Sequence, residues 1–220
     1  MITSAVSLCI GVAFETQTLQ SQSMPNNELD VLATVLRAQA KRLGERPLLI
    51  ATKTFDTGPM TVLAVPPTPI QKAAHQVELP YLLPPATRLA EARELAAAYN
   101  QGLLLAARPV SDHAVFSFPH RLLNDSLVEQ FEALYPGGNV YSKDLEKKRR
   151  AVSSRYRLFF DGSTTLWRVS RVAYAAGGAL AVVGLRSSGG GFYSESWAVL
   201  ERSGNMWDSL NWGSSVVTFA

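Results

Sequence analysis

Residues 165–185 read TLWRVSRVAYAAGGALAVVGL, in which two apolar runs rich in Val, Leu and aromatic residues flank a glycine pair. Runs of this composition between turn-forming residues are typical of β-strands. Comparable runs cover 155–160, 192–201 and 206–212, so strand and turn alternate at about ten-residue spacing through this part of the chain. The alternation predicts an antiparallel meander of four or five strands in the C-terminal part.

Helix-type patterns precede the strand-rich part. Helices are predicted over 27–43, 86–101, 125–134 and 143–152. Asn27 and Asn124 stand where each can act as an N-cap, by accepting a free backbone N–H of the first helical turn. Gly102 follows the second helix directly, at the position where glycine favours helix termination.

The first half of the chain also contains strand-like runs and a proline-rich stretch. Residues 47–55 and 60–65 are apolar runs separated by turn formers, which predicts a hairpin. A further buried strand is predicted at 103–110. Prolines recur between 66 and 85, and because proline interrupts regular helix and sheet, we expect this segment to be an extended internal connection.

Length and composition fit an ordinary globular protein. The chain has 220 residues, of which 47% are hydrophobic and 18% charged, so it can bury a substantial core. Helices gathered early and strands gathered late predict an α+β fold, with the helices packed on one face of the C-terminal sheet. We expect residues 1–27 to form a mobile N-terminus and residues 28–220 to form a single domain.

The apolar run at 5–14 bears on the location of the protein. It is too short to span a bilayer, which needs about 20 residues, but it has the length of a signal-peptide core. Gly11 and Ala13 form a small-x-small cleavage pattern, although no Lys or Arg precedes the run. The pattern predicts the remnant of a signal peptide and a periplasmic or secreted protein. A buried N-terminal element in a cytoplasmic protein is the alternative.

The net charge of +3 comes from 21 Lys and Arg against 18 Asp and Glu, and it is concentrated in residues 143–157, which hold seven basic side chains and two acidic ones. One interpretation is a solvated helix end, where cations stabilise the helix dipole. The other is a docking patch for a protein partner with an acidic surface. Its candidate binding residues are Lys147, Lys148, Arg149, Arg150 and Arg155. Nucleic acid is not expected as a partner, because a longer basic stripe with stacking aromatic residues is missing.

A glycine run at 189–191 joins two of the predicted strands. It lacks the lysine of a phosphate-binding loop and does not open a helix, so we interpret it as a hairpin loop and expect no cofactor. Loops at the edge of a sheet often contact partners, which makes Gly189, Gly190 and Phe192 further candidate binding residues.

Catalytic and metal-binding patterns are missing from the sequence. Asp112, His113 and His120 can be drawn as an acid–base or metal cluster, but side chains seven positions apart on an extended segment face opposite ways. No His-x-His, Glu-x-x-His or Gly-x-Ser-x-Gly pattern is present. We therefore expect no catalytic residue and no metal ligand. A small hydrolase with a site near these three residues is kept as an alternative.

The four tryptophans all fall in the strand-rich part. Tryptophans on strands usually belong to the core beneath the sheet. Trp207 and Trp212 could instead line a ligand surface, which leaves a ligand-binding module built on this sheet as another alternative.

Four short motifs follow one another in the second half of the chain. They are WxxSRVxY at 167–174, ALAVV at 179–183, GGGF at 189–192 and WxVLExxGxxW at 197–207. With these motifs, residues 80–212 resemble a loosely defined group of uncharacterised, mostly exported bacterial proteins. The resemblance implies a C-terminal antiparallel sheet and an exported location, and it implies no activity. The basic stretch at 143–150 departs from the pattern of that group.

Three observations point to the same class of function. Catalytic motifs are missing, a basic segment is present, and a glycine-rich loop lies at the edge of the predicted sheet. They favour a non-catalytic binding protein of the inhibitor or immunity type, which acts by protein–protein contact in a bacterium. The hydrolase and the ligand-binding module are the alternatives.

Overall fold

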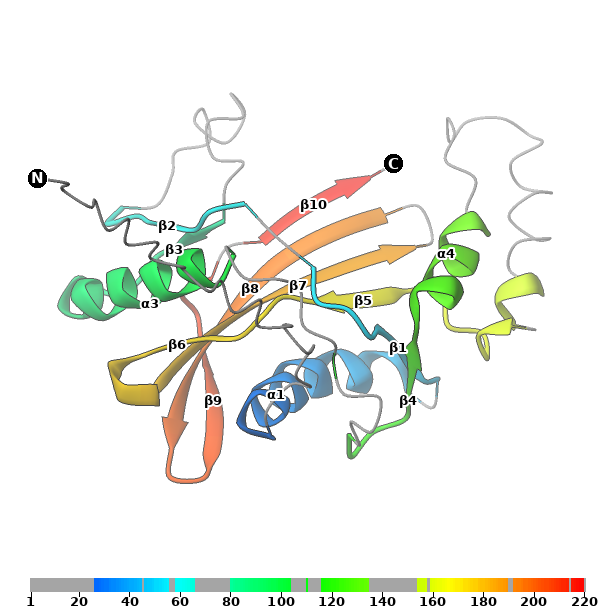
Figure 1. The fold of residues 1–220 in the computed structure, drawn as a ribbon, viewed down its shortest axis with the longest axis horizontal. Coiled ribbons are helices and arrows are strands. Elements are labelled where there is room, and N and C mark those ends of the chain that lie inside the picture. Colours follow the sequence, from blue (N-terminus) through cyan, green and yellow to red (C-terminus); the bar gives the residue numbers. More distant parts are fainter. Residues whose placement is uncertain are drawn as a thin grey trace, which may run out of the picture.

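The computed structural model describes residues 26–44, 46–55, 58–65, 80–103, 110, 116–134, 154–157, 159–189, 192–213 and 215–219 (Figure 1). The helices are α1 (Asn26–Leu43), α3 (Leu89–Gly102) and α4 (Asp125–Ala133), with 3₁₀ turns η1 (Ala86–Arg88) and η2 (Ala176–Gly178). The strands are β1 (Leu48–Ala51), β2 (Thr61–Val62), β3 (Tyr81–Leu82), β4 (His120–Leu123), β5 (Leu166–Val169), β6 (Ala173–Ala175), β7 (Leu180–Gly189), β8 (Phe192–Ser203), β9 (Met206–Leu210) and β10 (Ser215–Phe219).

The three α-helices confirm the helix predictions for 27–43, 86–101 and 125–134. Asn124 caps α4, since its Oδ1 accepts a backbone N–H of the first turn at 3.0 Å. α1 begins just before Asn27, which therefore lies inside the helix. The predicted helix at 143–152 and most of the predicted strand at 103–110 fall outside the described residues. None of the helices that the structure describes is long and apolar enough to cross a membrane.

The large sheet has eight strands and mixed pairing. Its main path runs β10–β8–β7–β5–β1–β4, while β6 pairs with β7 and β9 pairs with β8. The strands from β5 to β10 pair antiparallel, but β1 lies parallel to both β4 and β5. The α+β class is confirmed. The sheet is larger than a meander of four or five strands because β1 and β4, from earlier in the chain, extend it.

Two local predictions are wrong. The runs at 47–55 and 60–65 do not form a hairpin, because β1 joins the large sheet and β2 pairs parallel with β3 in a separate two-stranded sheet. Residues 154–157 are helical and do not form the first strand of the meander. Tyr156 and Phe160 lie four positions apart, so a helical turn brings both rings to one side, against α4.

The prediction that all helices pack on one face of the sheet is also wrong. Successive side chains of a strand point to opposite faces. On β7, Ala181 and Val183 pack in the cluster of α1, whereas Leu180 and Val182 pack in the cluster of α3. α4 covers Leu166 of β5, on the same face as α3. The sheet therefore lies between α1 on one face and α3 and α4 on the other (Figure 1).

Candidate functional site

The described candidate binding residues fall at the end of the sheet that lies beside α4. Arg155 belongs to the helical turn at 154–157, while Gly189 ends β7 and Phe192 begins β8. The other candidates, Lys147, Lys148, Arg149, Arg150 and Gly190, lie outside the described residues. The geometry of the site therefore rests on Arg155, Gly189 and their neighbours.

Three buried aromatic rings anchor this end of the molecule. The ring of Phe131 on α4 lies 5.1 Å from the ring of Tyr156 and 5.2 Å from the ring of Phe160, between centroids. All three residues are at most 2% exposed, and they share a core cluster with Leu49 and Leu166. Because the rings of Tyr156 and Phe160 are buried, the turn that carries them is fixed. The arginines on either side of Tyr156 are therefore held at the surface.

Arginines surround the anchored turn. Arg155 and Arg157 extend from the turn itself, and both are exposed. Arg46, which precedes β1, lies close to Arg157, since both side chains come within 3.9 Å of the point where a Cβ on Gly162 would stand. These three guanidinium groups come from two segments that are far apart in the sequence.

Phe159 is a large apolar side chain exposed at this end, with 53% of the residue accessible. Arg121 of β4 donates a hydrogen bond from Nη1 to the carbonyl oxygen of Phe159 at 2.8 Å. The carboxylate of Asp161 lies 3.8 Å from the same guanidinium group. We call this surface the arginine end. It comprises Arg46, Arg121, Arg155, Arg157 and Phe159.

Gly189 brings the end of β7 against the same aromatic anchor. A Cβ at this position would stand 2.1 Å from the carbonyl oxygen of Thr164 and 3.2 Å from the ring of Phe131. Its φ of +128° also lies in the region that favours glycine. Gly189 and the turn that carries Arg155 are therefore both neighbours of Phe131.

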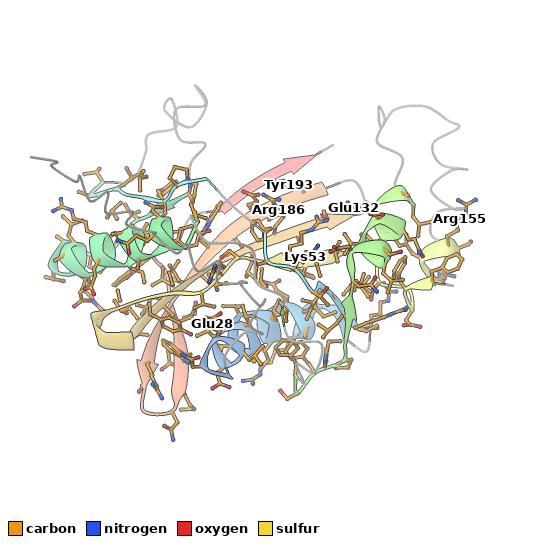
Figure 2. All side chains as sticks on the ribbon, viewed as in Figure 1. Glu28, Lys53, Glu132, Arg155, Arg186 and Tyr193 are labelled. Carbon is orange, nitrogen blue, oxygen red and sulfur yellow. The ribbon has the colours of Figure 1, made fainter. Side chains whose placement is uncertain are left out.

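Charged side chains continue from α4 across the sheet, where Figure 2 labels Glu132, Arg186 and Tyr193. Arg168 of β5 is 2.6 Å from Glu132 of α4, and Arg186 of β7 is 2.5 Å from Glu195 of β8. The hydroxyl of Tyr193 donates a hydrogen bond to the same oxygen of Glu195. Burial and this hydrogen bond raise the pKa of Tyr193 to about 12, so the hydroxyl keeps its proton at neutral pH. One ion pair thus links α4 to β5, and the other links β7 to β8.

His120 belongs to an aromatic cluster. Its ring lies edge-on to the rings of Phe116 and Phe118, at 5.0 and 6.0 Å, and its Nδ1 is 2.9 Å from the carbonyl oxygen of Phe118. Asp112 and His113 lie outside the described residues, so the hydrolase alternative stays a prediction. Within the part of the chain that the structure places, no group of three or more His, Cys, Asp or Glu residues could hold a metal ion.

The tryptophans divide between the two faces of the sheet. Trp167 and Trp207 pack against the α1 cluster, and Trp197 and Trp212 belong to the α3 cluster. Trp212 is buried, with the guanidinium group of Arg88 4.6 Å from its ring centroid. Trp207 and Trp212 thus belong to different clusters, and the ligand-binding alternative that relies on them stays a prediction.

Of the arginine end, the candidate binding residues named from the sequence include Arg155 alone and omit Arg46, Arg121, Arg157 and Phe159. Arg46 and Arg121 are isolated in the sequence, and only the parallel pairing of β1 with β4 brings them beside the helical turn. Phe159 falls in a run that predicts a strand. The four-residue spacing between Tyr156 and Phe160 puts both residues on one side of a helical turn or of a strand, and in either case it leaves Phe159 off the buried side.

Comparison with known proteins identifies no relative of the chain. No family model matches the chain, and neither a curated protein nor a solved structure is significantly similar to it. The resemblance to exported bacterial proteins therefore stays a prediction, and so does the exported location.

Proposed function

We propose that the protein is a non-catalytic binding protein of the inhibitor or immunity type, which recognises the acidic surface of a protein partner through the arginine end. The observation that carries the proposal is the exposure of Phe159 at the surface. Its carbonyl oxygen accepts a hydrogen bond from Arg121, and it follows Arg155 and Arg157 in the sequence, after the anchored turn. The location that we propose is the periplasm or the cell exterior, with the cytoplasm as the alternative.

The residue types at the arginine end are those that contribute most to protein interfaces. Aromatic and arginine side chains are enriched at interfaces and dominate their binding energy. The ring of Phe159 supplies apolar area that a partner can cover. The guanidinium groups of Arg155 and Arg157 can each bind a carboxylate through two parallel hydrogen bonds.

The charge balance of this region favours an acidic partner. Asp161 is an acidic residue beside the arginines, and it already lies close to Arg121. The basic residues at 147–150 precede the turn in sequence and add further positive charge. Positive potential of this kind raises the rate of association with an acidic surface and makes binding dependent on salt.

The test is purification of the tagged full-length protein from its own cells, followed by titration with the purified partner. We expect a Kd that weakens as salt rises. The double variant Arg155→Glu/Phe159→Ser removes the exposed ring and reverses one charge while Phe160 stays in the core. It should bind at least about tenfold more weakly than the wild type.

A matched control variant lies on the β8–β9 hairpin. Arg202→Glu/Met206→Ser makes the same kind of change, since Arg202 is exposed and Met206 is 69% exposed. It should bind the partner with the wild-type Kd. Equal weakening in both variants, binding that does not depend on salt, or co-purification of nucleic acid in place of a protein would contradict the proposal.

A further inference from the structure

Strand β10 lies at one edge of the large sheet (Figure 1). It pairs with β8 on one side, along its whole length from Ser215 to Phe219. No strand among the described residues pairs with its other side. An edge strand presents a row of backbone N–H and C=O groups with which a further strand can pair. β10 therefore offers such a row at the border of the sheet.

The neighbouring strand β3 stops short of β10. Leu82 of β3 pairs antiparallel with Gly213, which precedes β10. In this register Pro80 comes opposite Ser215, and proline has no N–H to donate. The pairing with β3 thus covers the chain just before β10 and, within the described ranges, does not continue along it.

The direction of the backbone groups along β8 follows from one hydrogen bond. The N–H of Arg202 donates to the carbonyl oxygen of Ala179 at 2.8 Å, on the side of β7. Successive residues of a strand direct their N–H and C=O groups to opposite edges, so the even-numbered residues of β8 bond toward β7. The odd-numbered residues Tyr193 and Glu195 therefore bond toward β10.

The same alternation applies to β10. Val216 and Thr218 lie opposite these two residues of β8 and bond with them. The N–H and C=O groups of Ser215, Val217 and Phe219 therefore point away from β8. The outer edge of β10 is thus a regular series of three residues, each with one donor and one acceptor.

The residue types of β10 leave this edge unprotected. Native proteins use charged residues, prolines or bulges to keep edge strands from pairing. β4, at the opposite end of the sheet, follows Pro119 and contains Arg121. β10 reads SVVTF, without a charged residue, a proline or a glycine, and its register with β8 is regular throughout. An edge of this kind is expected where a strand pairs in the assembled protein.

We infer that the protein forms a dimer in which β10 pairs antiparallel with β10 of a second copy of the chain, about a two-fold axis at Val217. Val217 then lies opposite Val217 of the partner subunit, and Ser215 lies opposite Phe219 of the partner subunit. All of these residues direct their backbone groups outward, so each opposite pair exchanges two N–H···O bonds.

A second copy matches this edge by symmetry. Its strand has the same length and the same series of outward groups, and no like charges come opposite each other because the strand carries none. Both copies use the same surface, so the interface closes as a dimer and joins the two sheets into one. Because the contacts are hydrogen bonds between backbone groups, the dimer should not weaken as salt rises, unlike binding at the arginine end.

The first experiment measures the mass of the purified full-length protein by light scattering and sedimentation over a range of concentrations. We expect a dimer that dissociates on dilution. Val217→Pro removes an outward N–H and leaves the bonds from β10 to β8 in place, so it should fold and dimerise at least about tenfold more weakly. Ser209→Pro is the matched control. Ser209 is an exposed residue of β9 whose N–H also points away from β8, and this variant should dimerise as the wild type does.

Three results would overturn the inference. They are a monomer at every concentration, a Val217→Pro variant that dimerises as well as the wild type, and open-ended oligomers, which would indicate pairing between different surfaces. Since these measurements need no other protein, their outcome does not depend on whether the arginine end binds a partner.

A cross-link tests the register and remains informative if the proline variant fails to fold. Cys9→Ser removes the single native cysteine. In that background Val217→Cys places two thiols opposite each other, with Cα atoms about 5.5 Å apart, within the range of about 4.4–6.8 Å that a disulfide spans. Mild oxidation should give a covalent dimer. Ser215→Cys, which lies opposite Phe219 of the partner subunit, should give at least about tenfold less. Equal cross-linking in the two variants, or none in Val217→Cys, would overturn the inference.

Discussion

Arg168 of β5 lies directly opposite Arg186 of β7 in the antiparallel ladder. Like charges at directly opposite positions destabilise a sheet. Two glutamates compensate the pair from different elements, Glu132 from α4 and Glu195 from β8. The two compensating contacts differ in solvent exposure, because the side chain of Glu195 is 17% exposed and that of Glu132 is 48% exposed.

Removing the charge of Glu195 should therefore destabilise the protein more than removing the charge of Glu132. We expect Glu195→Gln to lower the free energy of unfolding by about 1–2 kcal/mol, because Arg186 then lacks its partner in a half-buried place. Glu132→Gln should cost less than about 1 kcal/mol, as solvent-exposed ion pairs do. Urea unfolding of both variants measures the difference, and equal costs would contradict the assignment.

A methyl group at Gly189 should be poorly tolerated. A Cβ would collide with the carbonyl oxygen of Thr164, so we expect Gly189→Ala to cost more than about 3 kcal/mol of unfolding free energy. Gly204 is the control, because it also has a positive φ, +60°, but open space around it. Gly204→Ala should cost only about 1 kcal/mol, from backbone strain. Similar costs in the two variants would show that strain alone acts at Gly189.

Removing the N-cap of α4 should lower the free energy of unfolding by a smaller amount. Asn124→Ala removes the acceptor for the N–H of Leu127, and we expect a loss of about 1 kcal/mol of unfolding free energy. Asn124→Asp retains an acceptor and should restore most of that loss. Ser126→Ala, at an exposed position of the first turn, is the control and should change stability little. Thermal or urea unfolding distinguishes the three.

Tyr193 should ionise at a higher pH than an ordinary tyrosine, and its ionisation should make the stability of the protein depend on pH in the alkaline range. Because its pKa is raised from the usual value near 10 to about 12, the folded state favours the protonated hydroxyl. The resulting stabilisation is fully present below pH 10 and is lost as the pH rises from 10 to 12. Ultraviolet difference titration of the wild type against Tyr193→Phe should show this late ionisation. In Glu195→Gln the same ionisation should move to lower pH, and an unchanged titration there would contradict the role of Glu195.

The helices could be predicted because their signals are local. The cap at Asn124 and the apolar spacing within 86–101 lie inside the elements that they define. The helical turn at 154–157 could not be separated from a strand, because Tyr156 and Phe160 share one side in either conformation.

No local feature of the sequence predicts the pairing of β1 with β4 and β5. Leu49 lies between Arg121 of β4 and Leu166 of β5, and nothing in its own neighbourhood specifies those partners. The arginine end depends on this pairing, so its composition could not be predicted either. The covering of both sheet faces did have a signal, the unbroken apolar run at 179–183, since a strand covered on both faces is apolar throughout.

The position of β1 also sets the order in which the chain can fold during synthesis. β7, β8 and β9 pair with their neighbours in sequence, so they can form as soon as they leave the ribosome. β1 is made early but gains its second neighbour only when Leu166 has been added. Pairings between distant segments form slowly, because their loop-closure entropy must be overcome first. The edge of β1 that faces β5 therefore stays open until Leu166 has been added, although the other edge can pair with β4 once Leu123 has been made. An open strand edge invites aggregation, and chaperones protect such edges in newly made chains.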